Sequence, residues 1–263
     1  MLTVNKDNRT YFKSSLLENT KGLSHCFTSR VGGESRGVIC GLNLGFRVGD
    51  DPDSVKSNYM HIAEDFDFPY KNITAAKQIH STNVRVITKE EAGCGVSRLF
   101  DTFEADALVT KTPELPIAVF YADCVPVLLA DASAGVAAAV HSGWRGTVGR
   151  ISESTISVMK TLGATAENII AAIGPSIGPC CFETGGEVVC EFDSDLCTNM
   201  PDGKFKVDLW EANRRILLEC GVLPQNIEVL ELCTMCNSDM LYSYRTHKEQ
   251  TGRMGAFIML KKD

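Results

Sequence analysis

The sequence predicts a mixed α/β fold in a single domain. Short apolar runs typical of strands lie next to one another as well as next to helical segments, so the sheets should contain both antiparallel and parallel pairs. A doubly wound parallel sheet would need regular alternation of strands and helices. No repeat, low-complexity stretch or proline- and glycine-rich linker divides the 263 residues, which favours one domain over residues 1–263.

Three helices can be placed from their end signals. The first starts at Asp51-Pro52, because proline suits the first helical position. The second is predicted from Thr147 to Leu162, with Gly163 after it. The third starts after Asp208 as N-cap and ends before Gly221. The apolar stripe expected for the first helix is Val55, Tyr59, Ile62 and Phe66.

Strands are predicted where short aliphatic runs are bounded by turn residues. These runs are Arg85–Thr88, Ala107–Val109, Ile117–Phe120, Val125–Ala130, Val136–Val140, Ile169–Ile173, Ile227–Leu232 and Ala256–Leu260. Strands and helices together therefore predict mixed sheets packed between helices.

Composition narrows the classes of protein. The net charge is −7 and the basic residues are scattered, so a nucleic-acid partner is not expected, since phosphate contacts dominate that affinity. No stretch approaches the roughly 20 apolar residues of a membrane span. Residues 1–9 lack the basic-then-apolar pattern of a secretory signal, which predicts a cytoplasmic protein. The sequence does not indicate an oligomeric state.

Cysteine usage argues against a disulfide framework. The count is 11, an odd number, and no export signal precedes it, so reduced thiols are expected. Cys180 and Cys181 are adjacent, and Cys233-Thr-Met-Cys236 has the spacing of a metal or redox pair. A structural metal site made from these four cysteines is an alternative, but the sequence favours buried thiols.

The candidate metal ligands are His80, Cys124 and His141. Cys124 opens an apolar run, and His141 closes the next one after a small, polar, glycine-ended connection typical of a hairpin. A loop of residues 131–134 would place Cys124 opposite His141, with Cβ atoms roughly 5 Å apart. One thiolate with imidazoles is a zinc ligand set, and three protein ligands leave a fourth position open, as in catalytic sites. From spacing alone, a buried thiol and a turn-capping histidine are the alternative.

Several common sites are absent from the sequence. Residues 174–178 lack the GxGxxG spacing, and no GxxxxGK[ST] occurs, which argues against dinucleotide and P-loop sites. No GxSxG nucleophile elbow and no HxE…PCxxC deaminase signature is present either.

A set of motifs in a fixed order carries a family resemblance over nearly the whole chain. The motifs are Thr28-Ser-Arg30-Val-Gly-Gly33, Leu42-Asn-Leu-Gly45, Gly49-Asp-Asp-Pro52, Gln78-Ile-His80, Ala105-Asp-Ala-Leu-Val-Thr110, Ala122-Asp-Cys-Val-Pro126, His141-Ser-Gly-Trp-Arg-Gly-Thr147, Gly174-Pro-Ser-Ile-Gly-Pro-Cys-Cys181, Cys233-Thr234, Ser243-Tyr-Arg245 and Thr251-Gly-Arg253. Together they resemble the polyphenol oxidase (laccase)-like family, which is now understood as purine nucleoside phosphorylases and includes a peptidoglycan editing factor. Two positions depart from the family pattern: Phe182 replaces a common tyrosine and Tyr59 a common arginine.

The resemblance implies a fold, a metal and an activity. The fold would be one α/β domain distantly similar to bacterial toxin cysteine hydrolases. His80, Cys124 and His141 would bind Zn²⁺, with copper as the alternative, and would form the catalytic group with Arg145. The implied reaction is phosphorolysis of adenosine, inosine and methylthioadenosine, with adenosine deamination as a side activity. The partners would be small molecules: a purine nucleoside and phosphate.

Other functions stay open at this stage. A copper-dependent polyphenol oxidase ordinarily needs a histidine-rich cluster, and the chain has only 5 histidines. A cysteine hydrolase would use Cys124 as nucleophile and His141 as base. An amidase that edits a peptidoglycan precursor could use zinc-bound water. A metal-containing binding module without catalytic activity is the least favoured class, because it would not use the open coordination position.

Five residues receive expected roles. Arg145 follows a strand and precedes a helix, a place that suits phosphate, with an ion pair to a carboxylate as the alternative. Arg30 and Asn43 lie in glycine-flanked loops and are expected to contact substrate. Asp123 should point to the face opposite Cys124 and could orient a ligand. Trp144 is expected to be a packing residue.

Overall fold

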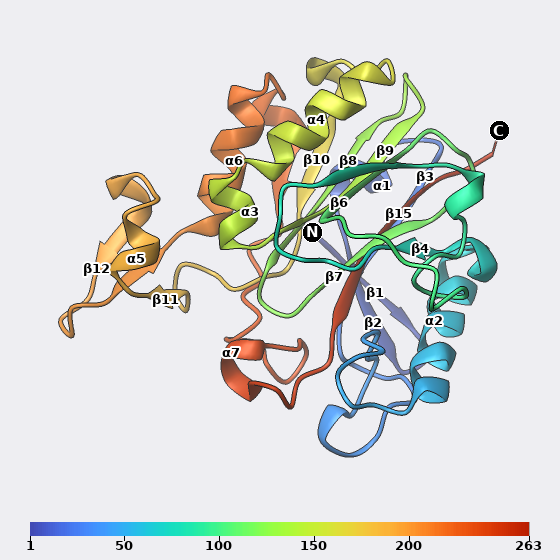
Figure 1. The fold of residues 1–263 in the computed structure, drawn as a ribbon, viewed down its shortest axis with the longest axis horizontal. Coiled ribbons are helices and arrows are strands. Elements are labelled where there is room, and N and C mark those ends of the chain that lie inside the picture. The colour runs from blue at the N-terminus through green and yellow to red at the C-terminus, as the bar shows by residue number, and fades with distance from the viewer. Residues whose placement is uncertain (263) are drawn as a thin grey trace.

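The computed structural model describes residues 1–262 and consists of two six-stranded sheets packed face to face between helices (Figure 1). The first sheet contains, in spatial order, β1 (Leu2–Lys6), β2 (Arg9–Lys13), β3 (Leu23–Thr28), β15 (Met254–Leu260), β7 (Ile117–Tyr121) and β4 (Thr74–Ala75). The second contains β14 (Ile227–Val229), β10 (Ile170–Ile173), β8 (Val125–Asp131), β9 (Val136–Ser142), β6 (Ala107–Thr110) and β5 (Val84–Ile87). The pairs β4–β7, β10–β14 and β5–β6 are parallel and the others antiparallel, which confirms the predicted mixed sheets.

Residues 1–262 form seven α-helices. They are α1 (Ser15–Glu18), α2 (Pro52–Phe66), α3 (Trp144–Val148), α4 (Ile151–Thr161), α5 (Gly186–Val189), α6 (Leu209–Glu219) and α7 (Tyr244–His247). α2 packs on the first sheet, whereas α4 and α6 pack on the second (Figure 1). Within residues 1–262, no helix combines the length and apolar character that a membrane span requires.

Side chains of β15 alternate between two hydrophobic cores, one on each face of the first sheet. On β15, Met254, Ala256 and Ile258 belong to the core between the two sheets, whereas Phe257 and Met259 pack with the buried stripe of α2. This alternation is the period-2 pattern of a strand buried on both faces. β8 and β9 are likewise buried along their whole length; His141 lies on β9, and Cys124 immediately precedes β8.

The helix predicted from Thr147 to Leu162 is wrong in its extent. The structure has two helices there, α3 and α4, which are separated at Gly149 and Arg150. Arg150 adopts left-handed backbone angles with φ 59°, which no continuous right-handed helix can include. The start of α2 after Asp51 and the start of α6 after Asp208 are confirmed, and both aspartates accept a backbone N–H as N-caps.

Seven strands and several short helices have no counterpart in the prediction. β1 to β3 form the far edge of the first sheet, and β1 is mostly exposed and polar, so it lacks an apolar pattern. A small sheet of β11 (Glu183–Thr184), β13 (Phe205–Val207) and β12 (Cys197–Asn199) projects from the body together with α5 (Figure 1).

The β8–β9 hairpin is shifted from its predicted register by two residues. Asp131 pairs with Val136, so that His141 lies opposite Pro126 and not opposite Cys124. The Asp131 carboxylate accepts the Ala134 N–H and thereby closes the loop, while Gly135 with φ 62° belongs to the turn. Because a shift of two residues preserves the face to which side chains point, Cys124 and His141 still lie on the same side.

Candidate metal centre and its cavity

Three side chains from separate segments converge at one end of the second sheet. One ligand atom from each of His80, Cys124 and His141 lies within 4.8 Å of the others. Cys124 immediately precedes β8, His141 lies on β9, and His80 lies in the loop between β4 and β5. The two imidazole rings stand edge to face with centroids 4.9 Å apart. The structure thus brings together the three predicted ligands.

The buried carboxylate of Asp106 shapes the loop that carries His80. Asp106 accepts the backbone N–H groups of Ile79, His80 and Ser81 at 3.2, 3.0 and 2.7 Å. His80 itself has φ 58°, which non-glycine residues rarely adopt and which costs energy unless the surroundings enforce it. Three charge-assisted hydrogen bonds to one carboxylate hold the backbone in this conformation.

Asp106 also orients the second histidine. His141 Nδ1 donates to Asp106 Oδ1 at 2.9 Å, and the His141 backbone N–H donates to the Asp106 carbonyl at 2.7 Å. This hydrogen bond fixes the tautomer and leaves Nε2 with its lone pair for an ion, as in carboxylate–histidine–metal arrangements. The sequence alone did not indicate this role of Asp106. Its charge among the apolar residues of the Ala105–Thr110 motif was the available signal.

Charges within the group stabilise the thiolate form of Cys124. Burial alone would raise the pKa of this thiol, but the neighbouring imidazoles of His141 and His80 lower it to about 6. Burial would lower the pKa of His141, whereas the Cys124 thiolate and Asp106 raise it. A deprotonated thiol beside two imidazoles is the form that metals bind.

Gly143 leaves room for this group. A Cβ atom at position 143 would lie 3.1 Å from Cys124 Sγ and 3.1 Å from His80 Nδ1. Gly143 is also the N-cap of α3, so its missing side chain lets the start of this helix lie close to the candidate ligands. Steric crowding by Cys124 and His80 therefore explains why this position of the His141–Thr147 motif is a glycine.

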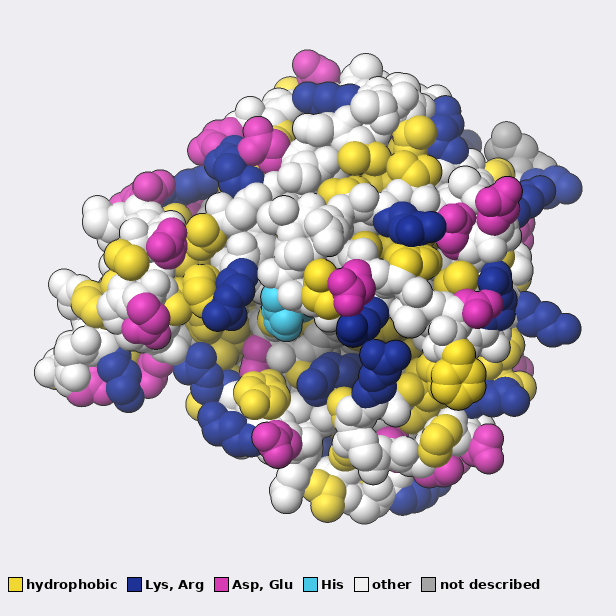
Figure 2. Space-filling model, in the orientation of Figure 1, with side chains coloured by type: hydrophobic (Ala, Val, Ile, Leu, Met, Phe, Trp, Pro, Cys, Tyr) yellow, Lys and Arg dark blue, Asp and Glu magenta, His cyan; other side chains and the backbone are white. Residues whose placement is uncertain are grey.

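The three candidate ligands lie in the wall of a cavity of about 640 Å³. Lysine and arginine side chains gather around the middle of this face of the molecule, where a histidine is exposed (Figure 2). The cavity wall combines aromatic side chains with three arginines: Phe46, Tyr59, Phe120, Tyr121, Trp144, Phe182, Tyr244, Arg47, Arg245 and Arg253. Tyr59 and Phe182, the two departures from the family pattern, both belong to this wall.

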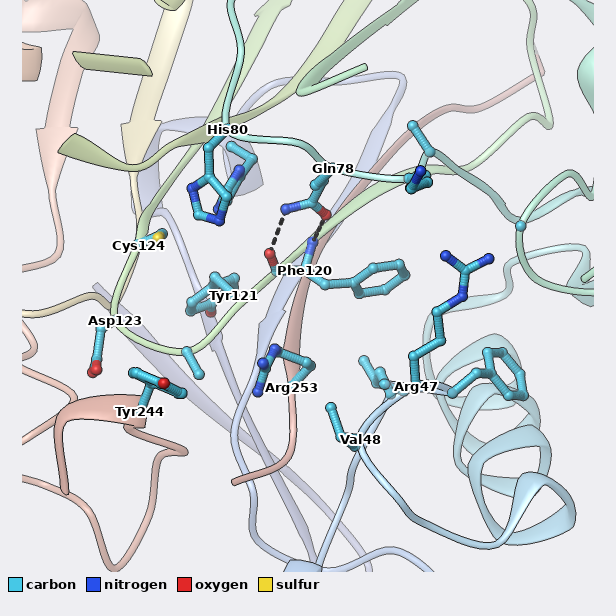
Figure 3. A pocket seen from close by; sticks show the side chains of 18 of the residues that line it. Arg47, Val48, Gln78, His80, Phe120, Tyr121, Asp123, Cys124, Tyr244 and Arg253 are labelled. Atoms are coloured by element: carbon cyan, nitrogen blue, oxygen red, sulfur yellow. Dashed lines mark hydrogen bonds between the residues drawn. The ribbon is translucent and has the colours of Figure 1, made fainter. Parts of the chain in front are cut away.

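Gln78 attaches the His80 loop to the first sheet. Its side-chain amide donates to the Phe120 carbonyl at 2.7 Å and accepts the Phe120 N–H at 2.7 Å (Figure 3). These bonds imitate the pairing of one more strand residue with β7. The first residue of the QxH motif therefore positions the loop and leaves His80 to face Cys124.

Arg253 is the arginine whose position is most closely controlled. The Asn43 side-chain oxygen accepts its backbone N–H at 2.8 Å, and its guanidinium donates to the Thr251 and Gly252 carbonyls at 3.1 and 3.0 Å. Burial lowers the pKa of Arg253, but a guanidinium keeps its charge in proteins. Figure 3 places this charge in the cavity, between Tyr244 and Val48. The sequence analysis assigned no role to Arg253.

The other predicted substrate contacts lie elsewhere. Arg30 donates to the Ser238 carbonyl at 2.9 Å and stacks over Tyr242 at 4.8 Å, away from the cavity wall. Asn43 is fully buried, and its side chain bonds Asp50, Gly45 and Arg253. Asn43 therefore acts on the cavity through the backbone of Arg253.

Arg145 and Trp144 form a pair at the start of α3. The exposed guanidinium of Arg145 lies 4.2 Å from the centre of the Trp144 ring, and Trp144 lines the cavity while Arg145 does not. The carboxylate partner considered for Arg145 is not found among residues 1–262. Trp144 also packs against the core between the second sheet and its helices.

The role expected for Asp123 changes because β8 begins only at Val125. Asp123 has φ 90°, so the alternation of a regular strand does not apply to it. Its carboxylate accepts the Thr234 hydroxyl and the Arg245 N–H, both at 2.6 Å. Asp123 therefore joins the Cys124 segment to the loop before α7.

Comparison with known proteins gives one consistent result. The family model described as multi-copper polyphenol oxidoreductase laccase matches residues 24–261. Purine nucleoside phosphorylase YlmD of Geobacillus stearothermophilus is 36% identical over 240 residues, 88% of each chain. Purine nucleoside phosphorylase YfiH of Escherichia coli is 34% identical over 91% of this chain and 95% of its own. Adenosine deaminase RL5, from an unknown prokaryotic organism, is 35% identical over 92% of this chain and 95% of its own. The crystal structure of YlmD from Geobacillus stearothermophilus superimposes with a TM-score of 0.91 at 31% identity over 99% of both chains.

Proposed function

Since the chain belongs to the family described as multi-copper polyphenol oxidoreductase laccase, we propose that it is a zinc-dependent purine nucleoside phosphorylase that also deaminates adenosine. Its substrates would be inosine, adenosine and methylthioadenosine. The observation that carries the proposal is the convergence of His80, Cys124 and His141 in the wall of a cavity of about 640 Å³. This volume is that of an ordinary small-molecule site. The names of the relatives supply the reaction.

The donor set fits zinc. A thiolate with a low pKa and two imidazoles, one of them oriented by Asp106, form the three-ligand arrangement of catalytic zinc sites. The family description suggests several coppers, which would need more histidines near the cavity. Of the other histidines, His25 lies fully buried beside Ser14, His61 pairs with Glu34, and His247 bonds the Ser243 carbonyl; none of the three lines the cavity. When bound, the zinc ion would polarise an oxygen of phosphate, water or substrate at its open position.

Different residues of the cavity wall would bind the two substrates, phosphate and the purine nucleoside. Arg253 would neutralise phosphate, which must be held as an anion near the ribose carbon that loses the base. Aromatic side chains such as Phe46 and Phe120 would cover the apolar faces of the purine. Phe46 is already stacked on Tyr59 with ring centroids 5.5 Å apart, so its orientation is fixed before binding.

The first test is incubation of inosine with and without phosphate, followed by chromatographic separation of the products. We expect hypoxanthine release that depends on phosphate, together with ribose 1-phosphate. Release that is equally fast without phosphate would indicate hydrolysis instead. If inosine, adenosine and methylthioadenosine all stay intact, the proposal fails and amide hydrolysis on a peptidoglycan precursor becomes the better explanation.

Arg253 and Arg145 can be compared in the same assay. Arg253→Gln is expected to raise the KM for phosphate about 10- to 100-fold, the effect of losing a hydrogen bond to a charged group. The KM for inosine should change much less. Arg145→Gln is the matched variant, because the sequence assigned phosphate to that exposed arginine; we expect it to have the smaller effect. A larger effect at Arg145 would show that its guanidinium leaves Trp144 to bind phosphate.

A cysteine hydrolase is the second candidate. The observation that favours it is the low pKa of the Cys124 thiol beside His141, because this pair could also act as nucleophile and base. In this alternative, His80 would only help His141 to stabilise the thiolate. Metal content of a Cys124 variant separates the two functions, since a nucleophile is not needed to retain zinc.

A further inference from the structure

Four cysteines form a second sulfur-rich group outside the candidate metal centre. The Sγ atoms of Cys180, Cys181, Cys233 and Cys236 all lie within 4.8 Å of one another. Cys236 Sγ is 3.6 Å from that of Cys180 and 3.4 Å from that of Cys181. No two of these cysteines are joined by a disulfide. The reaction proposed above uses none of them.

Local backbone structure explains how adjacent cysteines reach the same point. Cys180 and Cys181 lie in a turn after β10, where the Gly178 carbonyl accepts the N–H groups of Cys181 and Phe182, both at 2.9 Å. The alternation of a strand therefore does not apply to them, and both sulfurs lie near Cys236. Cys233 and Cys236 lie in a second turn, between β14 and α7.

The two turns are held together by their backbones. Ser176 and Cys233 form a parallel bridge, with Ser176 N–H donating to the Leu232 carbonyl at 3.1 Å and Thr234 N–H donating to the Ser176 carbonyl at 3.0 Å. The Gly178 N–H also points at Cys233 Sγ, 3.3 Å away. Such N–H groups stabilise a thiolate and orient it for an ion.

The sulfur separations match the size of one tetrahedral zinc ion. With Zn–S bonds of about 2.3 Å, neighbouring sulfurs of a tetrahedron are about 3.8 Å apart. The separations of 3.4 and 3.6 Å are close to this value and far above the roughly 2.05 Å of a disulfide. A cluster of two or four irons would spread at least two of the four cysteine sulfurs farther apart, because those sulfurs would bind different irons.

We propose that Cys180, Cys181, Cys233 and Cys236 bind a structural Zn²⁺ ion. Four protein ligands would fill the coordination shell, so this site would hold no substrate. Each thiol that binds would release its proton to solvent. Cys233 is buried and Cys180 and Cys236 are exposed, so the group is open to an incoming ion from one side.

The position of this site in the chain indicates its purpose. The turn of Cys180 and Cys181 lies beside Ile177 and Phe182, and the segment after Cys236 leads to Tyr244 and Arg245; all four of these neighbours line the cavity. A shared ion would therefore tie together two segments of the cavity wall that are 55 residues apart between Cys181 and Cys236. It would supplement the bridge that Asp123 makes to Thr234 and Arg245.

The test uses full-length Cys124→Ala protein, purified under reducing conditions from zinc-containing medium. This background lacks a ligand of the candidate catalytic centre, so the result does not depend on the purine reaction. We expect one zinc per chain by elemental analysis. X-ray absorption at the zinc edge should show four sulfurs at about 2.3 Å. Absence of metal, or a shell dominated by nitrogen or oxygen, would overturn the proposal.

Two further variants in the same background assign the ligands. Cys233→Ala should lose this zinc and lower the melting temperature, whereas Cys190→Ala, which removes an exposed cysteine outside the group, should retain it. If Cys233→Ala does not fold, the X-ray absorption spectrum of the Cys124→Ala protein still shows whether four sulfurs bind the zinc ion. A protein mass two hydrogens lower, with Cys236 linked to Cys180 or Cys181, would identify a disulfide pair and contradict the zinc site.

Discussion

Cys124→Ala is expected to lower the rate of phosphorolysis about 1,000-fold and to release the zinc of the catalytic centre. Metal ions contribute several kcal/mol of charge stabilisation to such reactions, and each 1.36 kcal/mol corresponds to about a factor of ten in rate. Cys124 would be the anionic ligand of the proposed zinc ion, and its Sγ lies with the two histidine nitrogens within 4.8 Å. Without it, two imidazoles would hold the ion in an incomplete shell.

Metal analysis and kinetics should be measured on the same preparations. Because the four-cysteine site would still hold one zinc, the expected content falls from two ions per chain to one. Cys220→Ala, which removes a partly buried thiol outside both groups, is the matched control and should keep both ions and the activity. If Cys124→Ala loses activity but no metal, Cys124 acts as a nucleophile and the zinc mechanism is wrong.

Asp106→Asn is expected to lower zinc affinity about 10- to 100-fold, the usual effect of removing a group that orients a metal-binding histidine. The asparagine oxygen can accept some of the backbone N–H groups. However, its NH₂ group accepts no hydrogen bond, so either His141 Nδ1 and the His80 N–H or the N–H groups of Ile79 and Ser81 lose their acceptor. The turn that holds His80 at φ 58° is also weakened. Competition with a chromogenic chelator would measure the affinity.

A second buried carboxylate provides the control for this experiment. Asp131 also accepts backbone N–H groups, those of Ala134 and Thr165, but it closes the far end of the β8–β9 hairpin. Asp131→Asn should therefore lower the melting temperature without changing zinc affinity. Equal losses of affinity in both variants would mean that Asp106 acts only on general stability.

Local signals in the sequence were sufficient for several elements. Asp51 and Asp208 mark helix starts because a capping side chain needs only neighbours three residues away. The central strands could be located because burial on both faces makes them continuously apolar. β1 escaped prediction because it is an exposed edge strand whose pairing partner, and not its own pattern, makes it a strand.

The sequence by itself nominated His80, Cys124 and His141 as candidate metal ligands, through the order of motifs that carries the family resemblance and through an apolar hairpin that puts two of them on one face. It could not determine the hairpin register, because that depends on how the Asp131 side chain closes its loop. Nor could it show that Asp106 holds two of the candidate ligands, or that Arg253 enters the cavity through Asn43. These contacts join residues 26 to 210 positions apart in the chain. Strand pairing within the second sheet brings Asp106 beside His141, and the loop of Asn43 folds back on the residue before β15; sequence spacing carries no record of these pairings.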